Sequence, residues 1–336
     1  MTVTPAADML RLLGGFEISQ ALYAVARTGL ADLLLSGPRP VTDLAEAAGV
    51  RSDLLRRLAR TLAAEDVFTL DEAEDTVGLG PLGTTLATGT PESVRNVALM
   101  WMETHYLPFA ELTQTLRDGS PSADRVLGQP FFDWLGQDPA KVATFSAAMA
   151  DLLRTLRQDA LASLDLAGVG SVVDVGGADG TALAELAERH PDLRGTVFDL
   201  PHVVAAATEL LSARGVADRV TAVGGDFFAS VPGPADCYLA CFILHDWPDD
   251  RATRILENVR AAAAPGARLF LVETVLGEGT QPQIANLMDL TMMGMLGGRE
   301  RTRDHWQTLL ATAGFRLDRI RPTKGPMCVI EATLQP

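Results

Sequence analysis

Short apolar runs alternate with longer amphipathic stretches from about residue 170 to the end of the sequence. Each apolar run has the length of a strand, and the stretches between most runs are long enough for helices. This alternation predicts a doubly wound α/β domain in which most strands are parallel. The last two runs, 314–321 and 327–333, are separated by only five residues. That is too few for a helical crossover, so we expect these strands to pair antiparallel.

The first 90 residues follow a helical period instead. Residues 8–35 carry aliphatic side chains at helical spacing, and 41–58 have the pattern of a helix-turn-helix. Two strand-like runs, 68–70 and 76–79, complete a winged-helix outline. Seven Arg, no Lys and twelve acidic residues give this segment a net charge of −5 (7 − 12). Because DNA phosphates require a basic face, we interpret the segment as a dimerisation domain and not as a DNA-binding one.

The residues between these two parts are expected to be helical and are rich in Met and aromatic side chains. Most of these side chains fill helix cores, and a subset is suited to line an apolar pocket for a flat ligand. We therefore predict a winged-helix-like dimerisation domain (1–90), a helical linker that contributes to the ligand pocket (91–168) and an α/β domain (169–336).

The chain as a whole is acidic, with 43 Asp plus Glu against 28 Lys plus Arg and a net charge of −15. This charge argues against nucleic acid or an anionic membrane as a partner. No apolar run approaches the roughly 18 residues of a membrane-spanning helix, and the N-terminal residues lack the pattern of a secretory signal. The three cysteines are too few for a disulfide scaffold. The sequence therefore predicts a cytoplasmic protein.

A glycine-rich turn follows the first predicted strand of the α/β domain. Asp174 lies at the end of that strand, and Gly176-Gly177-Ala178-Asp179-Gly180 leads into a helix. Glycines allow a tight turn and close approach of a ligand, and the start of a helix offers free N–H groups. The turn therefore has the features of a nucleotide-binding loop.

Acidic residues end the next two predicted strands. Asp199 follows Gly180 by nineteen residues, a position from which a carboxylate can bind both ribose hydroxyls of an adenosine ligand. Asp226 and Phe227 close the third strand, where a carboxylate and a ring can contact the edge and the face of an adenine. Together with the loop, these residues predict a site for an adenosine-containing cofactor.

The fourth predicted strand is almost entirely apolar and delivers His245, Asp246 and Trp247 to its carboxyl end. Open α/β sheets bind their ligands at that end. Glu273 ends the following strand, and Glu300 lies in the loop before the last helix, so both carboxylates can reach the same cleft. A histidine with carboxylates beside it is suited to act as a general base.

Metal and nucleophile chemistry have little support in the sequence. Cys237 and Cys241 are close in sequence, but four residues along a strand separate their side chains by roughly 13 Å. The remaining histidines show no metal-ligand spacing, and no G-x-S-x-G motif occurs. We predict no metal site.

These motifs together resemble the S-adenosylmethionine-dependent O-methyltransferases of the caffeate and hydroxyindole type, in particular bacterial members that modify aromatic natural products. The resemblance covers essentially the whole chain. It implies a class I, Rossmann-like methyltransferase domain with a terminal antiparallel hairpin, an N-terminal winged-helix dimerisation domain and a homodimer. The implied reaction is O-methylation of a phenolic hydroxyl on a small, polyketide-like aromatic molecule. The motifs that carry the resemblance are 173–177, 198–201, 225–228, 244–247 and 297–302.

The resemblance also assigns residues to roles. It implies that His245 is the general base and that Glu273 and Glu300 orient it. The residues implied to bind S-adenosylmethionine are Asp174, Gly176, Gly177, Asp199, Leu200, Gly225, Asp226, Phe227, Cys241 and Trp247. The residues implied to face the acceptor are Phe145, Met149, Met288, Asp289 and Met292.

Three features depart from the family pattern. Ala178 stands where the family usually has a third glycine, at a point where we expect the backbone to adopt a positive φ. Cys241 stands where plant members carry a cofactor-contacting lysine. The stretch before Gly297 is shorter than in plant members and lacks their acceptor-binding asparagine. Plant substrates therefore do not carry over to this chain.

Three alternatives remain open. A relative that hydroxylates or decarboxylates its substrate would share the fold, although the set of His245, Glu273 and Glu300 argues against it. Methylation of nitrogen or carbon also remains open, because a fold does not fix the acceptor atom. A winged-helix transcription regulator is the non-enzymatic alternative, and the charge of the N-terminal segment disfavours it.

Overall fold

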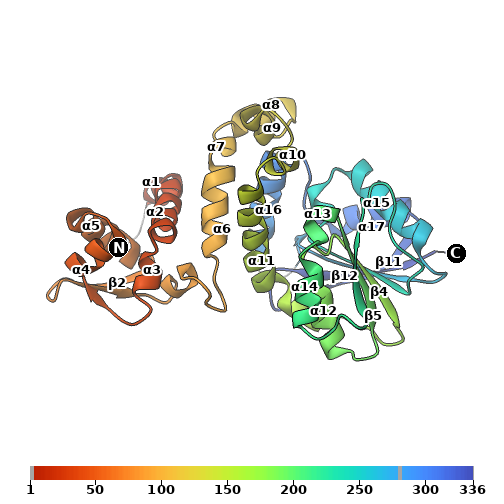
Figure 1. Cartoon of the computed structure of the whole chain (residues 1–336). Coiled ribbons are helices and arrows are strands. Elements are labelled where there is room, and N and C mark those ends of the chain that lie inside the picture. Colours follow the sequence, from red (N-terminus) through yellow and green to blue (C-terminus); the bar gives the residue numbers. More distant parts are fainter. Residues whose placement is uncertain (1–3, 279–281, 336) are drawn as a thin grey trace. The chain divides into compact units, whose positions relative to one another are not determined.

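The computed structural model describes residues 4–278 and 282–335 and divides into two compact units (Figure 1). One unit comprises Met1–Glu111 and Arg125–Thr155, and the other comprises Leu112–Asp124 and Leu156–Pro336. The segment 91–168 is mainly helical, and the two units divide it between them.

The N-terminal unit has the predicted winged-helix outline. Two helices meet at Gly49, which adopts a left-handed conformation with φ 67°. They are followed by a small antiparallel sheet of order β1-β3-β2. The aliphatic segment 8–35 forms three helices, since the chain is interrupted at Gly14 and at the left-handed Gly29. The elements are α1 (Pro5–Leu13), α2 (Gly15–Thr28), α3 (Leu30–Leu33), β1 (Arg39–Pro40), α4 (Val41–Ala48), α5 (Ser52–Ala63), β2 (Phe68–Asp71) and β3 (Thr76–Leu79).

Short helices and one long helix follow the winged helix. The long helix, α11 (Pro139–Ala162), begins in the first unit and ends in the second. The shorter elements are η1 (Gly83–Leu86), α6 (Arg95–Met100), the π-helical turn η2 (Trp101–His105), α7 (Tyr106–Phe109), α8 (Leu112–Asp118), α9 (Ser122–Leu127) and α10 (Phe131–Leu135).

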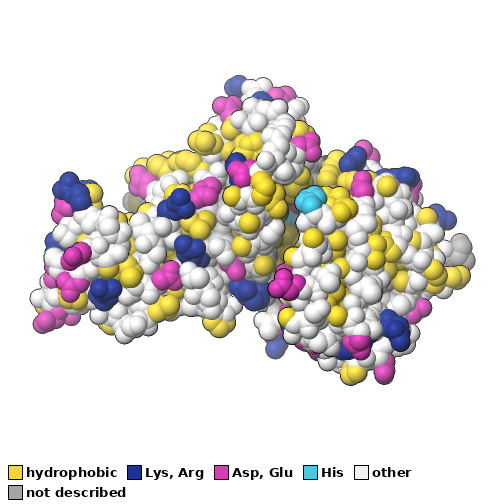
Figure 2. Space-filling view, viewed as in Figure 1, with side chains coloured by type: hydrophobic (Ala, Val, Ile, Leu, Met, Phe, Trp, Pro, Cys, Tyr) yellow, Lys and Arg dark blue, Asp and Glu magenta, His cyan; other side chains and the backbone are white. Residues whose placement is uncertain are grey.

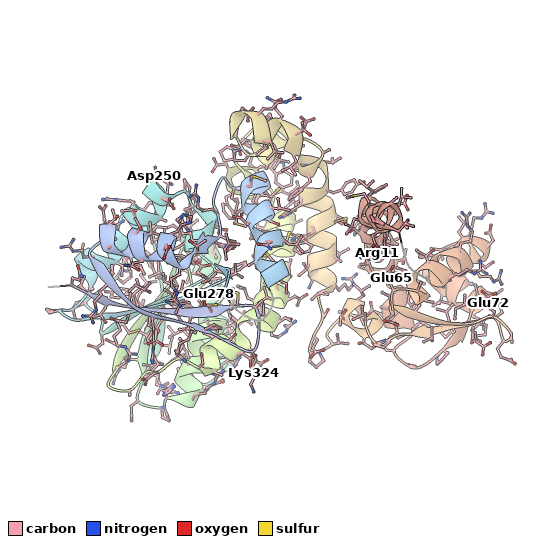
Figure 3. The ribbon with its side chains drawn as sticks, turned by 180° about the vertical axis from the view of Figure 1, so that it is seen from behind. Arg11, Glu65, Glu72, Asp250, Glu278 and Lys324 are labelled. Carbon is pink, nitrogen blue, oxygen red and sulfur yellow. The ribbon has the colours of Figure 1, made fainter. Side chains whose placement is uncertain are left out.

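The second unit is built on a seven-stranded sheet of order β11-β12-β8-β7-β4-β5-β6. The five strands from β8 to β6 in this order are parallel. Strand β12 pairs antiparallel with β8, and β11 pairs antiparallel with β12. This confirms the predicted doubly wound sheet with its terminal hairpin, whose turn is marked by Lys324 in Figure 3. The strands are β4 (Ser171–Val175), β5 (Arg194–Asp199), β6 (Val220–Gly224), β7 (Cys237–Cys241), β8 (Arg268–Glu273), β11 (Phe315–Pro322) and β12 (Cys328–Leu334).

Helices cover both faces of this sheet, with α12 and α14 on one side and α15 and α17 on the other (Figure 1). Strand β7 is buried along its whole length, as its apolar sequence predicts for a central parallel strand. A short parallel pair joins β9 (Val275–Leu276) to β10 (Arg301–Thr302). The helices are α12 (Thr181–Arg189), α13 (Pro201–Val204), α14 (Ala207–Ala213), α15 (Asp249–Ala262), α16 (Pro282–Met295) and α17 (Arg303–Thr312), and a 3₁₀ turn, η3 (Leu244–Asp246), follows β7.

Two properties of the surface bear on partners. Among the described residues, no helix combines the length and the apolar composition needed to cross a bilayer. On the face shown in Figure 2, the basic side chains of the N-terminal unit are interspersed with acidic ones and do not gather into one basic patch. This distribution agrees with the negative charge counted for residues 1–90.

Candidate active site

The parallel order of the sheet places the carboxyl ends of β4, β5, β7 and β8 at one edge. At the end of β4, the N–H groups of Gly176 and Gly177 both donate to the Phe198 carbonyl, at 2.8 and 3.2 Å. A Cβ on Gly176 would come within 2.3 Å of the Ile243 side chain. Gly176 also has φ 74°, a conformation that favours glycine at this point of the turn.

Asp199, at the end of β5, fastens this turn. One carboxylate oxygen accepts from the Ala178 N–H at 3.0 Å, and the other accepts from the Leu200 N–H at 2.7 Å. Ala178 has φ 47°, so the residue that replaces the family's third glycine adopts the left-handed conformation, at a cost of about 1 kcal/mol. Burial raises the pKa of Asp199, and its two backbone hydrogen bonds lower it.

The loop after β6 lies beside Asp199. The Gly225 N–H donates to the Asp199 carbonyl at 2.9 Å, and the Asp226 carboxylate accepts from the Phe228 N–H at 2.8 Å. Phe227 and Trp247 meet edge to face with ring centroids 6.1 Å apart. The structure thus brings the residues predicted at the ends of β5, β6 and β7 to one edge of the sheet, with aromatic rings beside them.

A buried pair of opposite charges without hydrogen bonds lies behind the glycine turn. Asp174 is 1% exposed, and its Oδ2 has no hydrogen-bond partner among the described residues. Burial raises its pKa to about 7, while the charge of Arg157 lowers it. Arg157, from α11, is 9% exposed, and no described group hydrogen-bonds or ion-pairs with its guanidinium. Two buried charged groups left unsatisfied are costly to folding and indicate a ligand site.

Arg157 was missed by the sequence analysis. The signal was present, because Arg157 shares a helical face with the buried Ala160 and Leu161, three and four residues later. Cys241, by contrast, offers no charge to a ligand. Burial raises the pKa of its thiol well above the ordinary value, so the position of the plant lysine holds a neutral group in this chain.

Replacing Asp174 with asparagine should stabilise the ligand-free protein above neutral pH. Because the pKa of about 7 in the folded protein exceeds the 3.8 of an ordinary aspartate, folding binds a proton at pH values between the two, and stability falls as pH rises through this window. At pH 8, Asp174→Asn is expected to raise the free energy of unfolding by about 1–3 kcal/mol, because the neutral amide costs less to bury than a carboxylate without hydrogen bonds. Urea unfolding at pH 4 and pH 8, with the exposed Asp192→Asn as control, checks this. An equal effect at both pH values would contradict it.

His245 lies in the turn η3 after β7 and is 1% exposed. Its Nδ1 is 2.6 Å from Oε1 of Glu300, and its Nε2 is 3.3 Å from Oδ1 of Asp246. The second oxygen of Glu300 accepts from the Thr274 hydroxyl at 2.5 Å. The imidazole is therefore held in one orientation, with a carboxylate at each ring nitrogen.

Glu273 contacts the backbone and not the ring. Its Oε1 accepts from the N–H groups of Ile243 and Leu244, at 3.1 and 2.9 Å, while Oε2 is buried and has no partner among the described residues. Glu273 thus fixes the turn that carries His245, and Glu300 fixes the imidazole itself. The sequence analysis expected both carboxylates to orient His245, but it did not distinguish a contact with the backbone of the turn from a contact with the ring.

The carboxylates control the protonation of His245. Burial lowers the pKa of the imidazole, but the negative charges of Glu300, Asp246 and Glu273 outweigh this and raise the pKa to about 10. Burial likewise raises the pKa of Glu273 to about 7, although the charge of His245 lowers it. A proton that reaches this cluster is therefore held on the imidazole.

The segment before α17 encloses the His245 turn. The Arg299 N–H donates to the His245 carbonyl at 2.9 Å, and a Cβ on Gly298 would come within 2.0 Å of that oxygen. Arg301 is completely buried and donates to the carbonyls of Leu244 and Trp247, at 2.8 Å each. The motif 297–302 therefore acts as a scaffold for His245 as well as the source of Glu300.

His245, Glu273 and Glu300 also form the kind of cluster that can hold a metal, since one ligand atom from each lies within 4.8 Å of the others. Their hydrogen bonds account for this proximity. Nδ1 of His245 faces Glu300 at 2.6 Å, and Oε1 of Glu273 accepts two backbone N–H groups. A metal ion would have to replace these contacts.

The residues predicted to face the acceptor lie in both units. In the first unit, the partly buried Phe145 and Met149 follow one helical turn apart on α11, and the Phe145 ring is 5.7 Å from that of Phe131. In the second unit, Met288 and Met292 are buried on one face of α16. On the same helix, Oδ1 of Asp289 accepts from the backbone N–H of Glu300 at 2.9 Å.

Comparison with known proteins agrees with this architecture. Residues 109–316 match an O-methyltransferase domain, and residues 10–89 match an O-methyltransferase dimerisation domain. The chain is 36% identical to the phenazine O-methyltransferase PhzM of Lysobacter antibioticus, over 96% of this chain and 95% of that one. It is 35% identical to the aclacinomycin 10-hydroxylase RdmB of Streptomyces purpurascens, over 92% of this chain and 84% of the other.

The fold extends to a human enzyme. The structure of human N-acetylserotonin methyltransferase in complex with S-adenosylmethionine superimposes with a TM-score of 0.90 and 26% identity, over 100% of this chain and 99% of that one. The two domain matches together span most of the sequence, and the bacterial relatives match it over nearly its whole length. The chain therefore belongs to the family of O-methyltransferases that combine this catalytic domain with this dimerisation domain.

Proposed function

We propose that this protein transfers the methyl group of S-adenosylmethionine to a phenolic hydroxyl of a small, polyketide-like aromatic natural product, with His245 as general base, and that it acts as a homodimer. The observation that carries the proposal is the buried His245, held between Glu300 and Asp246 at the end of β7. Strand β7 pairs directly with β4, so the imidazole follows the strand beside the one that ends in the glycine turn.

The residues around the turn fit S-adenosylmethionine. The Asp199 carboxylate suits the two ribose hydroxyls, and Asp226 with Phe227 suits the adenine. Asp174 and Arg157, whose buried Oδ2 and Nε have no hydrogen-bond partner among the described residues, match the ammonium and the carboxylate of the amino-acid end, because each would gain a hydrogen-bonded partner of opposite charge. When bound, S-adenosylmethionine supplies a methyl group on a sulfonium ion.

His245 handles the acceptor proton. An unperturbed phenol with a pKa near 10 is only about 0.1% ionised at pH 7, so holding its proton elsewhere is useful. An acceptor hydroxyl at Nε2 would take the place of Asp246, and Glu300 at Nδ1 would stabilise the resulting imidazolium. Because the neighbouring carboxylates keep His245 protonated at neutral pH, the imidazole must first lose that proton to solvent before it can accept the proton of the phenol. Turnover should therefore rise with pH.

This mechanism predicts how Asp246→Asn changes the pH profile. The Asp246 carboxylate raises the pKa of His245, so its removal should move the rising limb of kcat/KM to lower pH by about one unit or more. The profiles are measured with one acceptor for both proteins, so that ionisation of the acceptor is common to them. The exposed Asp250→Asn (labelled in Figure 3) is the matched control and should leave the limb in place. An unshifted limb in Asp246→Asn would contradict the assignment.

A hydroxylase is the second candidate, since one relative carries that name. Only the name of that relative favours hydroxylation. The contact of His245 with Glu300 and the contacts of Glu273 with the backbone of the turn favour removal of a proton from the acceptor. Mass spectrometry of the protein incubated with S-adenosylmethionine and a panel of simple and polycyclic phenols tests the choice. A gain of one methylene with release of S-adenosylhomocysteine supports methyl transfer. A gain of oxygen, or loss of carbon dioxide, would overturn it.

A further inference from the structure

Phe242, the first residue after β7, has a backbone conformation that is unusual for so large a side chain. Its φ is 60°, in the left-handed region that bulky L-residues rarely adopt. Among the described residues, the other non-glycine positions with a positive φ are Asp66, Asp75 and Ala178. Aspartate tolerates this region and alanine is small, so Phe242 is the position of this group at which a bulky side chain is held in a strained conformation.

The turn after β7 explains why the backbone adopts this conformation. The Phe242 N–H still pairs with β8, since it donates to the Val272 carbonyl at 2.9 Å. Ile243 then returns to the right-handed region, with φ −118° and ψ −51°. The N–H groups of Ile243 and Leu244 both donate to Oε1 of Glu273. A left-handed residue followed by a right-handed one directs successive N–H groups toward one anion, so the positive φ at 242 helps to fix the turn.

The backbone of the turn does not explain the side chain of Phe242. A glycine at this position would adopt the same φ without strain. The chain has instead a phenylalanine whose ring lies against the His245 imidazole, with ring centroids 3.9 Å apart and planes inclined by 50°. This is closer than the roughly 4.5–7 Å of most aromatic pairs, so the two rings overlap. Phe242 is 9% exposed and His245 is 1% exposed, so this contact lies away from water.

The charged groups around the imidazole make different contacts. Glu300 contacts Nδ1 and Asp246 contacts Nε2, both at the edge of the ring. Glu273 accepts from the backbone of the turn, and Arg301 donates to carbonyls of the same turn. Phe242 adds a contact with the face of its own ring. The π face of an aromatic ring attracts a cation, and more strongly where water is excluded, so an imidazolium gains more from this contact than a neutral imidazole.

We propose that Phe242 is a positioning residue that holds the His245 imidazole against the face of its ring and stabilises the imidazolium formed when His245 takes the proton of the acceptor. The proton passes from the acceptor hydroxyl to Nε2, and the positive charge forms beside the Phe242 ring as the phenolate forms. His245 is thereby a stronger base than the carboxylates alone would make it. The inference rests on the proposed function only in identifying His245 as the base, because the two rings are in contact without an acceptor.

Packing alone explains Phe242 less well. A leucine or a methionine would fill similar space with the same backbone, and a glycine would remove the strain. The two roles also predict different results. Loss of packing lowers the stability of the fold, whereas loss of the aromatic face lowers the pKa of His245.

The pKa of His245 in the ligand-free protein therefore tests the proposal. It is measured by NMR of ¹³C-labelled histidine, with the His245 signal identified by its loss in His245→Ala. Phe242→Leu and Phe242→Met both remove the aromatic face and should each lower the pKa by about one unit, a tenfold change in the ionisation equilibrium. Two side chains of different shape are used so that one can replace the other if it prevents folding. Phe242→Tyr keeps the ring and should keep the pKa close to that of wild type.

Phe315→Leu is the matched control, because it removes a buried ring from the core of the same unit. Its His245 pKa should equal that of wild type. An unchanged pKa in Phe242→Leu and Phe242→Met would overturn the inference. An equal fall in Phe242→Tyr or in Phe315→Leu would also overturn it, since the fall would then follow from disturbed packing.

Turnover gives a second readout. In Phe242→Leu and Phe242→Met, the rising limb of kcat/KM should move to lower pH by the same amount as the pKa. The plateau of kcat should fall by about two- to fivefold, because a weaker base transfers the proton more slowly. A lower pKa of His245 without any movement of this limb would leave the contact between the rings standing and would overturn His245 as the base of the proposed function.

Discussion

Replacing His245 with alanine is expected to lower kcat by about 10² or more while leaving the affinity for S-adenosylmethionine near that of wild type. The expected loss is the usual contribution of a general base. The imidazole contacts Glu300 and Asp246, whereas the residues proposed to bind the cofactor lie on the turn after β4 and on β5 and β6. In this variant, kcat should therefore fall while the affinity for the cofactor stays the same.

The measurement pairs steady-state turnover with calorimetric titration of S-adenosylhomocysteine. Removing the imidazole leaves the buried Glu300 carboxylate without its cationic partner, which destabilises the fold by itself. The double variant His245→Ala/Glu300→Gln removes that charge and should be more stable than the single variant but equally slow. His305→Ala, on the surface of α17, controls for loss of any histidine. Unchanged turnover in His245→Ala would eliminate the general-base role.

Replacing Arg157 with methionine is expected to weaken S-adenosylhomocysteine binding by about 10- to 100-fold. Arg157 is 9% exposed and its buried Nε has no hydrogen-bond partner among the described residues, and a hydrogen bond to a charged group contributes about 1.5–3 kcal/mol. Methionine keeps most of the length and the apolar stem while removing the charge. The same change should stabilise the ligand-free protein, because it removes a buried charge without hydrogen bonds.

Two comparisons make this prediction specific. 5′-Methylthioadenosine lacks the amino-acid end, so its affinity should be the same for wild type and Arg157→Met. Arg154→Met, one turn earlier on α11, removes an arginine whose side chain is 47% exposed and should leave both ligands unaffected. A loss of affinity for 5′-methylthioadenosine equal to that for S-adenosylhomocysteine would show that Arg157 supports the fold of the site and does not bind the amino-acid end.

Local pattern was sufficient for the frame of the second unit. The length of each apolar run and the short link between the last two strands predicted the parallel sheet and its antiparallel hairpin, since both follow from chain geometry. The sequence pattern was less reliable for residues 8–35. The helical spacing of aliphatic residues continues past Gly14 and Gly29, but the structure has separate helices that end at these two glycines. A glycine can either continue a helix or end it, and the sequence alone does not show which of the two occurs.

Contacts between distant residues explain what the sequence left out of the site. Strand ends predicted that Asp199, His245 and Glu273 would lie along the same edge of the sheet, because parallel strands share a carboxyl edge. Which atoms meet depends on packing. Oδ1 of Asp289, for example, accepts from the Glu300 N–H. Arg157 resembles any charged residue of a long helix until its burial is known.

Transfer of a ¹³C-labelled methyl group from S-adenosylmethionine tests the central claim most directly. The carbon chemical shift of the product distinguishes a methyl group on oxygen from one on nitrogen or carbon. Wild type and a phenolic acceptor should give a single aryl methyl ether signal, with one S-adenosylhomocysteine released per methyl group transferred. A labelled methyl group on nitrogen or carbon, or an oxidised product without label, would contradict O-methylation by this site.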